Sequence, residues 1–211
     1  MAAETVDVLI IGAGASGAAM AWSLAETKMH IVCLEQCALM NPLAYPSTGR
    51  DWEARQQGDF NSNPNVRGLK TDYPINEENS PIKVANFNGV GGGTVLYAGH
   101  FPRFHPSDFR VKSLDGVADD WPIDYNQLAP YSAENENMTG VAGMNGAPAY
   151  PSVTAQRLPP LPLGESGKVL AKGFNALGYH WWPSDTAIIT EDYDGRAGCI
   201  NLGACGAGCA Q

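Results

Sequence analysis

The 211-residue sequence has little that would suit a membrane or a nucleic acid. It contains no apolar run of about 18 residues, the length that a transmembrane helix requires. Lys and Arg number 13 against 22 Asp and Glu, which gives a net charge of −9, and no basic patch is visible. Nucleic acids and anionic membrane surfaces attract basic patches. The composition therefore predicts no nucleic-acid partner and no transmembrane segment.

The start of the sequence has no room for a secretory signal peptide, because the first predicted strand begins at Val6. We therefore expect a cytoplasmic protein, while export on the signal of a partner, into a periplasm, stays open. Without a secretory signal, the five cysteines indicate thiols, metal binding or redox chemistry rather than a disulfide framework.

Strands are also scarce. Only one strand–helix–strand unit is visible, whereas a doubly wound sheet needs several parallel strands with their crossover helices. We expect an α/β, Rossmann-like FAD/NAD(P)-binding fold with an incomplete sheet. The chain is then an N-terminal fragment, or other segments complete its sheet. The 24 glycines and 15 prolines predict a large share of loops.

The visible unit covers residues 6–35, VDVLIIGAGASGAAMAWSLAETKMHIVCLE. Its aliphatic run at 6–11 is typical of a strand buried on both faces of a parallel sheet. An Ala-rich helix is predicted over 15–27 and a second buried strand over 30–34. This order of elements is that of a dinucleotide site.

Gly12, Gly14 and Gly17 provide the GxGxxG spacing between the first strand and the helix. In this motif the first glycine allows a tight turn and the second lets the backbone approach a pyrophosphate. The third lets the helix pack closely on the strand. The first helical amides, at Ala15 and Ser16, are then expected to point at the phosphates.

Glu35 ends the second strand, close to the spacing of about 20 residues at which this motif places an acid for a ribose diol. An acid there repels a 2′-phosphate, which argues against NADP. The motif alone does not distinguish FAD from NAD.

A second glycine cluster follows a short strand predicted over 81–88, in the sequence GVGGGT at 89–94. Three adjacent glycines remove every side chain from a patch of backbone at a cost in chain entropy. Such a patch suits a site where something flat or bulky presses on the main chain. A flexible loop is the alternative.

The run GVGGGTVLYAGHFPRFHPSD at 89–108, with WPID at 121–124 and LAPY at 128–131, resembles the glucose-methanol-choline (GMC) oxidoreductase family. The likeness is strongest to its choline- and gluconate-dehydrogenase-like branch, and it extends over nearly the whole chain. It implies an FAD-dependent enzyme that oxidises the CH–OH group of an alcohol, a sugar or a polyol, with hydride transfer to the flavin.

The resemblance assigns roles to individual residues. Gly12, Gly14 and Gly17 face the pyrophosphate, and Glu35 holds the adenosine ribose. The family's Gly-Gly-Ser/Thr element beside the pyrophosphate and flavin corresponds to Gly92, Gly93 and Thr94.

Leu96 stands where some family members attach FAD covalently through a histidine, so the resemblance implies a non-covalent flavin here. Tyr97 stands where other members place an asparagine or a tryptophan beside the flavin ring, and Ala98 follows it in the same wall. The family's catalytic base is a histidine in its C-terminal portion, which no residue here matches. The catalytic residues are therefore unknown.

Arg103, His105 and Asp108 follow the second glycine motif. We interpret them as part of a connector whose polar groups hold a loop, rather than as catalytic groups.

Two domains are expected: an FAD-binding domain at 1–110, with a long polar excursion at 41–80, and the start of a substrate or cap lobe at 111–211.

In the second lobe, Asp124 is predicted to cap a helix at 125–138. A second, amphipathic helix is predicted at 164–177 and a short strand at 187–190. The Pro- and Gly-rich stretch at 140–162 is interpreted as a linker.

Cys199, Cys205 and Cys209 form C-x₅-C-x₃-C in a glycine-rich loop at the end of the sequence. Buried thiols, or one disulfide with a spare cysteine, are the simpler explanations. Zinc normally takes four Cys or His ligands, whereas three cysteines suit an iron–sulfur cluster that lacks one iron. The family resemblance implies such a cluster, which would relay electrons to a cytochrome or quinone partner.

Two other hypotheses stay open at this point. The chain could be a non-catalytic fragment that binds FAD or a cluster, or it could belong to a flavin- or NAD-dependent oxidoreductase of another family.

Overall fold

The computed structural model describes residues 5–209. The chain divides into two compact units, one made of Met1–Ala98 with Asn201–Gln211 and the other of Gly99–Ile200. Each unit is described by itself. The domain boundary expected after residue 110 stays a prediction for the whole protein.

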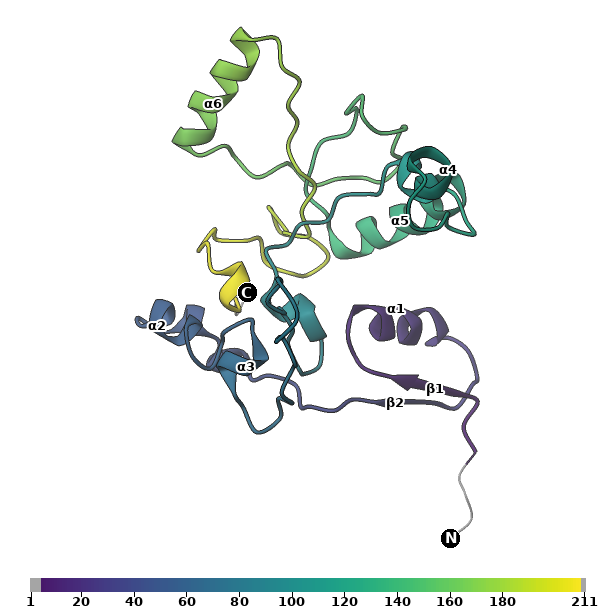
Figure 1. Ribbon diagram of the computed structural model, residues 1–211, viewed down its shortest axis with the longest axis vertical. Coiled ribbons are helices and arrows are strands. Elements are labelled where there is room, and N and C mark those ends of the chain that lie inside the picture. The colour runs from purple at the N-terminus through teal and green to yellow at the C-terminus, as the bar shows by residue number, and fades with distance from the viewer. Residues whose placement is uncertain (1–4, 210–211) are drawn as a thin grey trace. The chain divides into compact units, whose positions relative to one another are not determined.

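The first unit begins with a β–α–β element, as the sequence predicts. Strand β1 (Val8–Ile11) pairs in parallel with β2 (Ile31–Leu34), and α1 (Ala15–Leu24) connects them. In Figure 1 this helix lies against one face of the pair. The result is a Rossmann-like α/β element whose parallel sheet is open and has two strands among the described residues.

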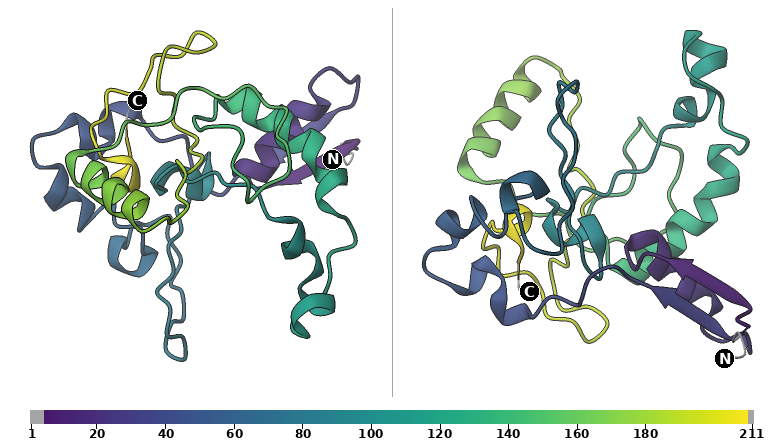
Figure 2. Two further views of the ribbon diagram at one scale, coloured as in Figure 1. Left: turned by 90° about the horizontal axis from the view of Figure 1, so that it is seen from above. Right: turned by 60° about the horizontal axis from the view of Figure 1, so that its bottom comes forward.

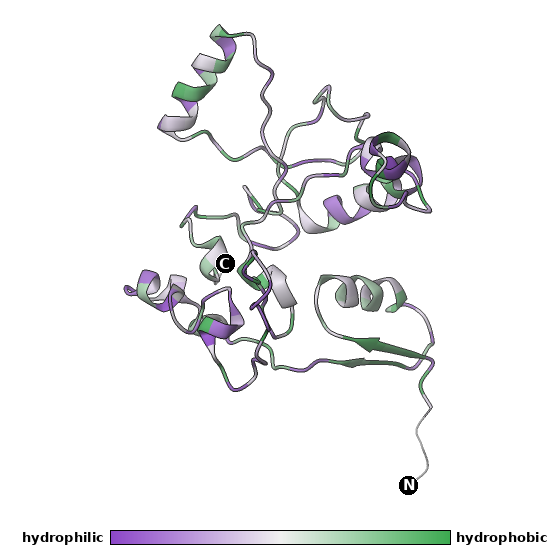
Figure 3. Cartoon of the chain, in the orientation of Figure 1, coloured by the Kyte–Doolittle hydropathy of each residue, from purple (hydrophilic) through white to green (hydrophobic). Residues whose placement is uncertain are grey.

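The two strands are less buried than the sequence predicts. Figure 3 shows that both are hydrophobic along their length. Nevertheless Leu9, Ile11 and Leu34 are exposed, with 82% of Ile11 accessible. The reason is that α1 covers only part of the pair, so the described residues leave apolar strand surface uncovered.

The polar excursion contains short helical segments rather than continuous loop. They are η1 (Pro42–Ala44), η2 (Pro46–Thr48), α2 (Trp52–Gln56) and α3 (Pro64–Arg67). Phe60, Phe87 and Leu96 form a small hydrophobic cluster, against which Met40 and Tyr45 pack. Beyond α3, the chain near residues 70–88 runs out and back as a narrow loop (Figure 2).

The prediction of a strand over 81–88 is wrong, because this segment pairs with no strand among the described residues. Its backbone is held in other ways. Asn86 donates its N–H to the Ser62 carbonyl at 2.8 Å, and its own carbonyl accepts from Arg67 Nη1 at 3.0 Å. Because these hydrogen bonds join the segment to a loop carbonyl and to a side chain instead of to a strand, the segment has no regular secondary structure.

A buried ion pair anchors the excursion. Arg67 Nη2 lies 2.6 Å from Asp72 Oδ1, and Arg67 Nε lies 2.9 Å from Asp72 Oδ2. Burial alone would raise the pKa of Asp72, but hydrogen bonds from Arg67 and from the Leu69 N–H hold it below its usual value.

This pair predicts a pH-dependent stability. A carboxyl whose pKa is lowered by folding stabilises the protein above its unfolded pKa of about 3.9. That stabilisation is lost as the pH falls through the folded pKa. We expect Asp72→Asn to lower the melting temperature at neutral pH, by an amount that shrinks below about pH 4. Melts over a pH series check this, with exposed Asp59→Asn as the control; a difference that does not change with pH would contradict it.

Among the described residues, the second unit contains four helical segments joined by long loops. They are η4 (Pro106–Arg110), α4 (Val111–Asp115), α5 (Tyr125–Thr139) and α6 (Glu165–Ala176). Helix α5 begins at a capping box, in which Asp124 accepts from the Gln127 N–H at 3.0 Å. Both helices predicted for this region are confirmed. Among the helices of residues 5–209, none combines the length and apolarity needed to span a membrane.

Two predictions for the second unit are wrong. The stretch 140–162 is no linker, since Val141 and Ala142 are fully buried and Ala142 bridges to both Leu158 and Thr186. No strand forms over 187–190, where the described backbone makes single hydrogen bonds to separate loops instead of a ladder. These loops form the interior of the unit together with the buried residues Phe109 of η4 and Tyr125, Ala133 and Glu136 of α5.

Candidate cofactor site

The three glycines of the first motif have the backbone environments that the motif requires. Gly12 has φ +93°, in the left-handed region that a tight turn after β1 uses. A Cβ on Gly17 would overlap the carbonyl oxygen of Gly12, so α1 can lie on the turn only without that side chain. A Cβ on Gly14 would meet nothing within 4 Å. Open space thus lies over the turn at the position expected for a pyrophosphate.

The beginning of α1 is free of competing groups. Gly14 is the N-cap residue, no side chain caps the helix, and its first turn carries no acidic residue. The amides of Ala15 and Ser16 lie in this turn, where the helix dipole is positive. The arrangement suits an anion.

Glu35 lies directly beside the turn. Its Oε2 accepts from the Ala13 N–H at 2.6 Å, and its Oε1 accepts from the Cys37 N–H at 3.2 Å. These backbone hydrogen bonds lower the pKa of the Glu35 carboxyl. The group is therefore an anion at neutral pH and can accept hydrogen bonds from hydroxyl groups.

The second glycine motif packs on the first. The Gly91 N–H donates to the Ala13 carbonyl at 2.8 Å, and Gly91 forms a bridge with Gly14. A Cβ on Gly92 would lie 3.3 Å from the Cα of Gly14. Two motifs far apart in the sequence thus share one backbone surface, whose side-chain-free positions could accommodate a bound nucleotide.

The residues from Thr94, the last of this motif, to Ala98 face different surroundings. They lie in or next to η3 (Gly92–Leu96). Thr94 Oγ1 donates to the Gly91 carbonyl at 2.6 Å, while Ala98 is exposed. Leu96 is only 9% exposed and packs with Phe60 and Phe87. Tyr97 is half-buried, and burial, together with the nearby Cys205 thiol, raises its pKa.

The structure places the cysteines predicted as metal ligands at three half-buried positions. Cys205 and Cys209 lie in the first unit and Cys199 in the second. Cys205 begins η5 (Cys205–Ala207), which contacts η3. Within residues 5–209, no three His, Cys, Asp or Glu side chains gather in a way that could hold a metal ion. The cluster stays a prediction.

Arg103 holds its segment in place, as expected, through partners that the sequence did not reveal. Its Nε lies 2.6 Å from Glu136 Oε1 and its Nη2 lies 3.0 Å from Glu136 Oε2. Arg157 Nη2 reaches Glu136 Oε2 at 3.4 Å, and Arg157 also pairs with Asp185. No local pattern signals these pairs, because their members are far apart in the sequence.

His105 and Asp108 also have structural roles. The His105 N–H donates to Asp108 Oδ2 at 2.7 Å in a capping box at the start of η4. The ring of His105 stacks on Tyr150 with centroids 4.1 Å apart. These contacts hold the segment in place, as interpreted from the sequence, while the absence of a catalytic role stays a prediction.

Comparison with known proteins agrees with this geometry. Residues 10–39 match the NAD(P)-binding Rossmann-like domain. Over 95% of its length the chain aligns with 2-methyl-1,2-propanediol dehydrogenase from Mycolicibacterium austroafricanum at 43% identity, and it covers 36% of that protein. Over 97% of its length it aligns with the fructose dehydrogenase large subunit from Gluconobacter japonicus at 29% identity, covering 41% of that protein. Over 94% of its length it aligns with 6'''-hydroxyparomomycin C oxidase from Streptomyces lividus at 31% identity, covering 35% of that protein.

The chain spans between 35% and 41% of the length of these three relatives. All three are named as dehydrogenases or oxidases. Together with the Rossmann-like domain, they support a flavin or nicotinamide cofactor.

Proposed function

We propose that the whole protein is an FAD-dependent dehydrogenase or oxidase, because this chain belongs to the glucose-methanol-choline (GMC) oxidoreductase family. Its substrate would be an alcohol, a sugar or a polyol, oxidised at a CH–OH group. The names of the relatives support this class, since they include a diol dehydrogenase and a fructose dehydrogenase.

One observation carries the choice of cofactor: the contact between the two glycine motifs. A nucleotide that lies over the first turn would continue onto the Gly91–Thr94 backbone, which the Gly91–Ala13 hydrogen bond holds against it. The side-chain-free surface therefore extends beyond the pyrophosphate position. That extension would support the half of a dinucleotide that follows the pyrophosphate, and the likeness of Gly92, Gly93 and Thr94 to the family's Gly-Gly-Ser/Thr element beside the flavin favours FAD over NAD for that half.

Each residue group has a proposed role in holding FAD. Gly12, Gly14 and Gly17, with the amides of Ala15 and Ser16, would bind the pyrophosphate. Gly92, Gly93 and Thr94 would lie beside the pyrophosphate and flavin. The anionic Glu35 would accept the hydroxyl hydrogens of the adenosine ribose.

The flavin would be held without a covalent bond. Leu96 has no nucleophilic atom, and its side chain is turned into the cluster with Phe60 and Phe87. It would support the second glycine motif from the protein side, while Tyr97 and Ala98 border the ring. When bound, FAD would supply the hydride-accepting chemistry. The base that removes the hydroxyl proton is not assigned to any residue here.

Electrons would leave toward a cytochrome or quinone partner. A cluster bound by Cys199, Cys205 and Cys209 would provide the route. Contact between η5 and η3 supports this by bringing the turn that begins at Cys205 against the second glycine motif.

The test is an absorbance spectrum of anaerobically purified full-length protein, before and after acid precipitation. Flavin bands that pass into the supernatant would support non-covalent FAD. Flavin that stays with the pellet would contradict the role of Leu96, and a folded protein that binds only a nicotinamide would contradict FAD. Broad visible absorption in addition to the flavin bands, lost in Cys205→Ser, would support the cluster.

The open space over Gly14 predicts a variant that loses FAD without losing its fold. In Gly14→Ala the new methyl group would occupy that space and meet no protein atom. We expect FAD affinity to fall by about 100-fold, which corresponds to ~2.7 kcal/mol, with the melting temperature of the apoprotein unchanged. FAD titration by fluorescence and apoprotein melts measure the two effects.

Gly164→Ala is the matched control, because Gly164 is also the N-cap residue of a helix, α6, its Cβ also meets nothing within 4 Å and its backbone is not left-handed. It should bind FAD like the wild type. Equal FAD affinity in Gly14→Ala and Gly164→Ala would place the cofactor away from the turn.

A further inference from the structure

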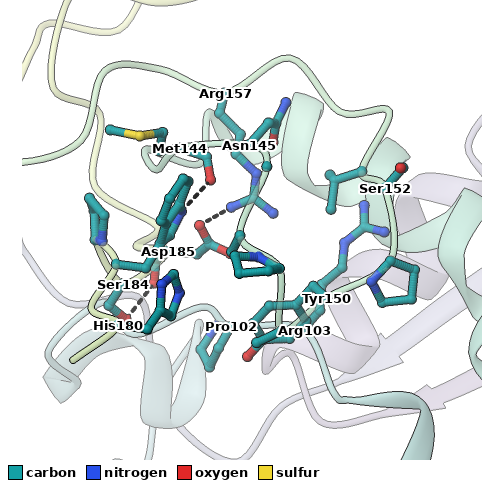
Figure 4. A pocket seen from close by; sticks show the side chains of 18 of the residues that line it. Pro102, Arg103, Met144, Asn145, Tyr150, Ser152, Arg157, His180, Ser184 and Asp185 are labelled. Atoms are coloured by element: carbon teal, nitrogen blue, oxygen red, sulfur yellow. Dashed lines mark hydrogen bonds and ion pairs between the residues drawn. The ribbon is translucent and has the colours of Figure 1, made fainter. Parts of the chain in front are cut away.

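Glu35 and Asp185 bind different kinds of partner. Asp185, in the wall of a cavity of the second unit, pairs with the side chain of Arg157 (Figure 4). Glu35, in the first unit, instead accepts hydrogen bonds from two backbone N–H groups, those of Ala13 and Cys37. A carboxylate that binds N–H groups restrains the backbone itself. The Glu35 side chain therefore acts directly on the turn that follows β1.

The backbone at Ala13 is held on two sides. Its N–H donates to Glu35 Oε2 at 2.6 Å, and its carbonyl accepts from the Gly91 N–H at 2.8 Å. No peptide bond among the described residues is cis, and a trans peptide group carries its N–H and its C=O on opposite sides. The Ala13 carbonyl and the Gly14 N–H belong to one peptide group. The bond to Gly91 therefore turns the Gly14 N–H away from Gly91.

The Gly14 N–H is a donor without a partner in the part of the chain that the structure describes. Gly14 is nevertheless half-buried. A backbone N–H that is shielded from water and unpaired costs free energy, and a bound anion would satisfy it. The two hydrogen bonds on Ala13 thus set the direction of a donor at the turn over which open space lies.

The charge of Glu35 opposes an anion at this turn. Its backbone hydrogen bonds lower the pKa of the carboxyl, so the group is an anion at neutral pH. Like charges repel, so charge alone would make Glu35 unfavourable for a diphosphate bound beside it. A role in holding the turn would favour the same diphosphate. Because the two effects have opposite signs, a binding measurement tells them apart.

We propose that Glu35 is a positioning residue for the pyrophosphate, in addition to its bond with the adenosine ribose. Its carboxylate holds the Ala13 N–H, and together with Gly91 it directs the Gly14 N–H to the anion. The bonds to Ala13 and Cys37 leave lone pairs of the carboxylate for a ribose hydroxyl, so the two roles are compatible. This inference rests on the proposed FAD site.

Calorimetric titration of the full-length apoprotein with ADP and with 2′,3′-dideoxy-ADP tests the proposal. ADP is the half of FAD that carries the adenosine and the diphosphate. The dideoxy compound keeps the adenine and the diphosphate but lacks both ribose hydroxyls, so a residue that binds only the ribose has no contact with it to lose. We expect Glu35→Ala to weaken the binding of 2′,3′-dideoxy-ADP by about tenfold. Unchanged or tighter binding would overturn the proposal.

Asp7→Ala is the matched control. Asp7 Oδ2 also accepts from a backbone N–H of the strand pair, that of His30 at 2.7 Å, but it lies before the start of β1 and not at the turn. The substitution removes the same charge and a hydrogen bond of the same kind. It should leave the affinity for 2′,3′-dideoxy-ADP unchanged. Equal weakening in Asp7→Ala and Glu35→Ala would mean a general loosening of the β–α–β element and would sink the proposal.

Glu35→Asp provides a second route if melts show that Glu35→Ala does not fold. It keeps the negative charge, so the repulsion stays, but its shorter side chain reaches less far toward the Ala13 N–H. We expect 2′,3′-dideoxy-ADP to bind about threefold more weakly. Affinity equal to that of the wild type would count against the positioning role.

The wild type separates this inference from the cofactor proposal. Wild-type apoprotein that binds neither ADP nor FAD would overturn the FAD site, and the positioning role with it. Wild-type apoprotein that binds both, with the affinity for 2′,3′-dideoxy-ADP unaffected by substitution of Glu35, would overturn the positioning role alone.

Discussion

Gly17→Ala should be among the most damaging single substitutions in the first unit. The added methyl group would overlap the Gly12 carbonyl and lie 3.2 Å from Ile10 Cγ2. Alanine normally gains about 1 kcal/mol over glycine inside a helix. Here we expect a net loss of about 2–3 kcal/mol, because α1 must move away from the turn on which it packs. The loss should appear as a lower melting temperature of the apoprotein, with FAD binding lost as well.

Gly173→Ala is the control for this prediction. It makes the same change inside a helix, α6, at a position where the new Cβ meets nothing within 4 Å. It should leave the melting temperature unchanged or raise it slightly. If Gly17→Ala melts like Gly173→Ala, then close packing of α1 on the turn is not what the glycine provides.

Glu136→Gln should unfold or severely weaken the second unit. Glu136 is 1% exposed, and its carboxylate is shared by Arg103 and Arg157, whose side chains are also buried. Removing one charge of a buried network leaves the others uncompensated, which typically costs 3–5 kcal/mol, so we expect a loss of about that size. Thermal or urea unfolding followed by tryptophan fluorescence measures it.

Glu134→Gln tests whether the effect belongs to the network. Glu134 lies two positions earlier on α5 and is exposed, so its substitution should change stability by about 0.5 kcal/mol or less. Similar stabilities of the two variants would mean that the network contributes little. Simultaneous replacement of Glu136, both arginines and Asp185, the second partner of Arg157, by apolar residues of similar volume should recover part of the loss.

The β–α–β element was predictable because its signals are local. The aliphatic run of β1, the glycine spacing and the Ala-rich helix each act within a few residues, and the predicted elements agree with the observed ones to within about three residues. The same holds for α5, whose capping box lies wholly between Asp124 and Gln127.

The errors concern segments whose structure depends on distant partners. Residues 140–162 look like a linker because they are rich in proline and glycine. Their burial comes from bridges of Ala142 to Leu158 and Thr186 and from the ion pairs of Arg157. Likewise, the apolar segments at 81–88 and 187–190 meet loops instead of strands. Pattern alone does not tell a strand from an apolar loop segment.

The candidate site was predictable in part. Sequence spacing identified both glycine motifs and Glu35, but not the backbone hydrogen bond that joins the motifs or the carboxylate's contact with Ala13. The family pattern placed Leu96 at the position of covalent flavin attachment in other members, but it did not reveal that the Leu96 side chain packs with Phe60 and Phe87. A pattern of residue types does not specify which way a side chain turns.

The bridge between Gly14 and Gly91 has a kinetic consequence. The two glycines are separated by a segment of roughly 75 residues, and such a loop must close before the bridge forms. Long-range contacts of this kind slow folding. During synthesis, β1, α1 and β2 can fold together early. The complete nucleotide-binding surface can form only after Gly91 has left the ribosome. FAD added during refolding should therefore accelerate only the steps that follow this closure.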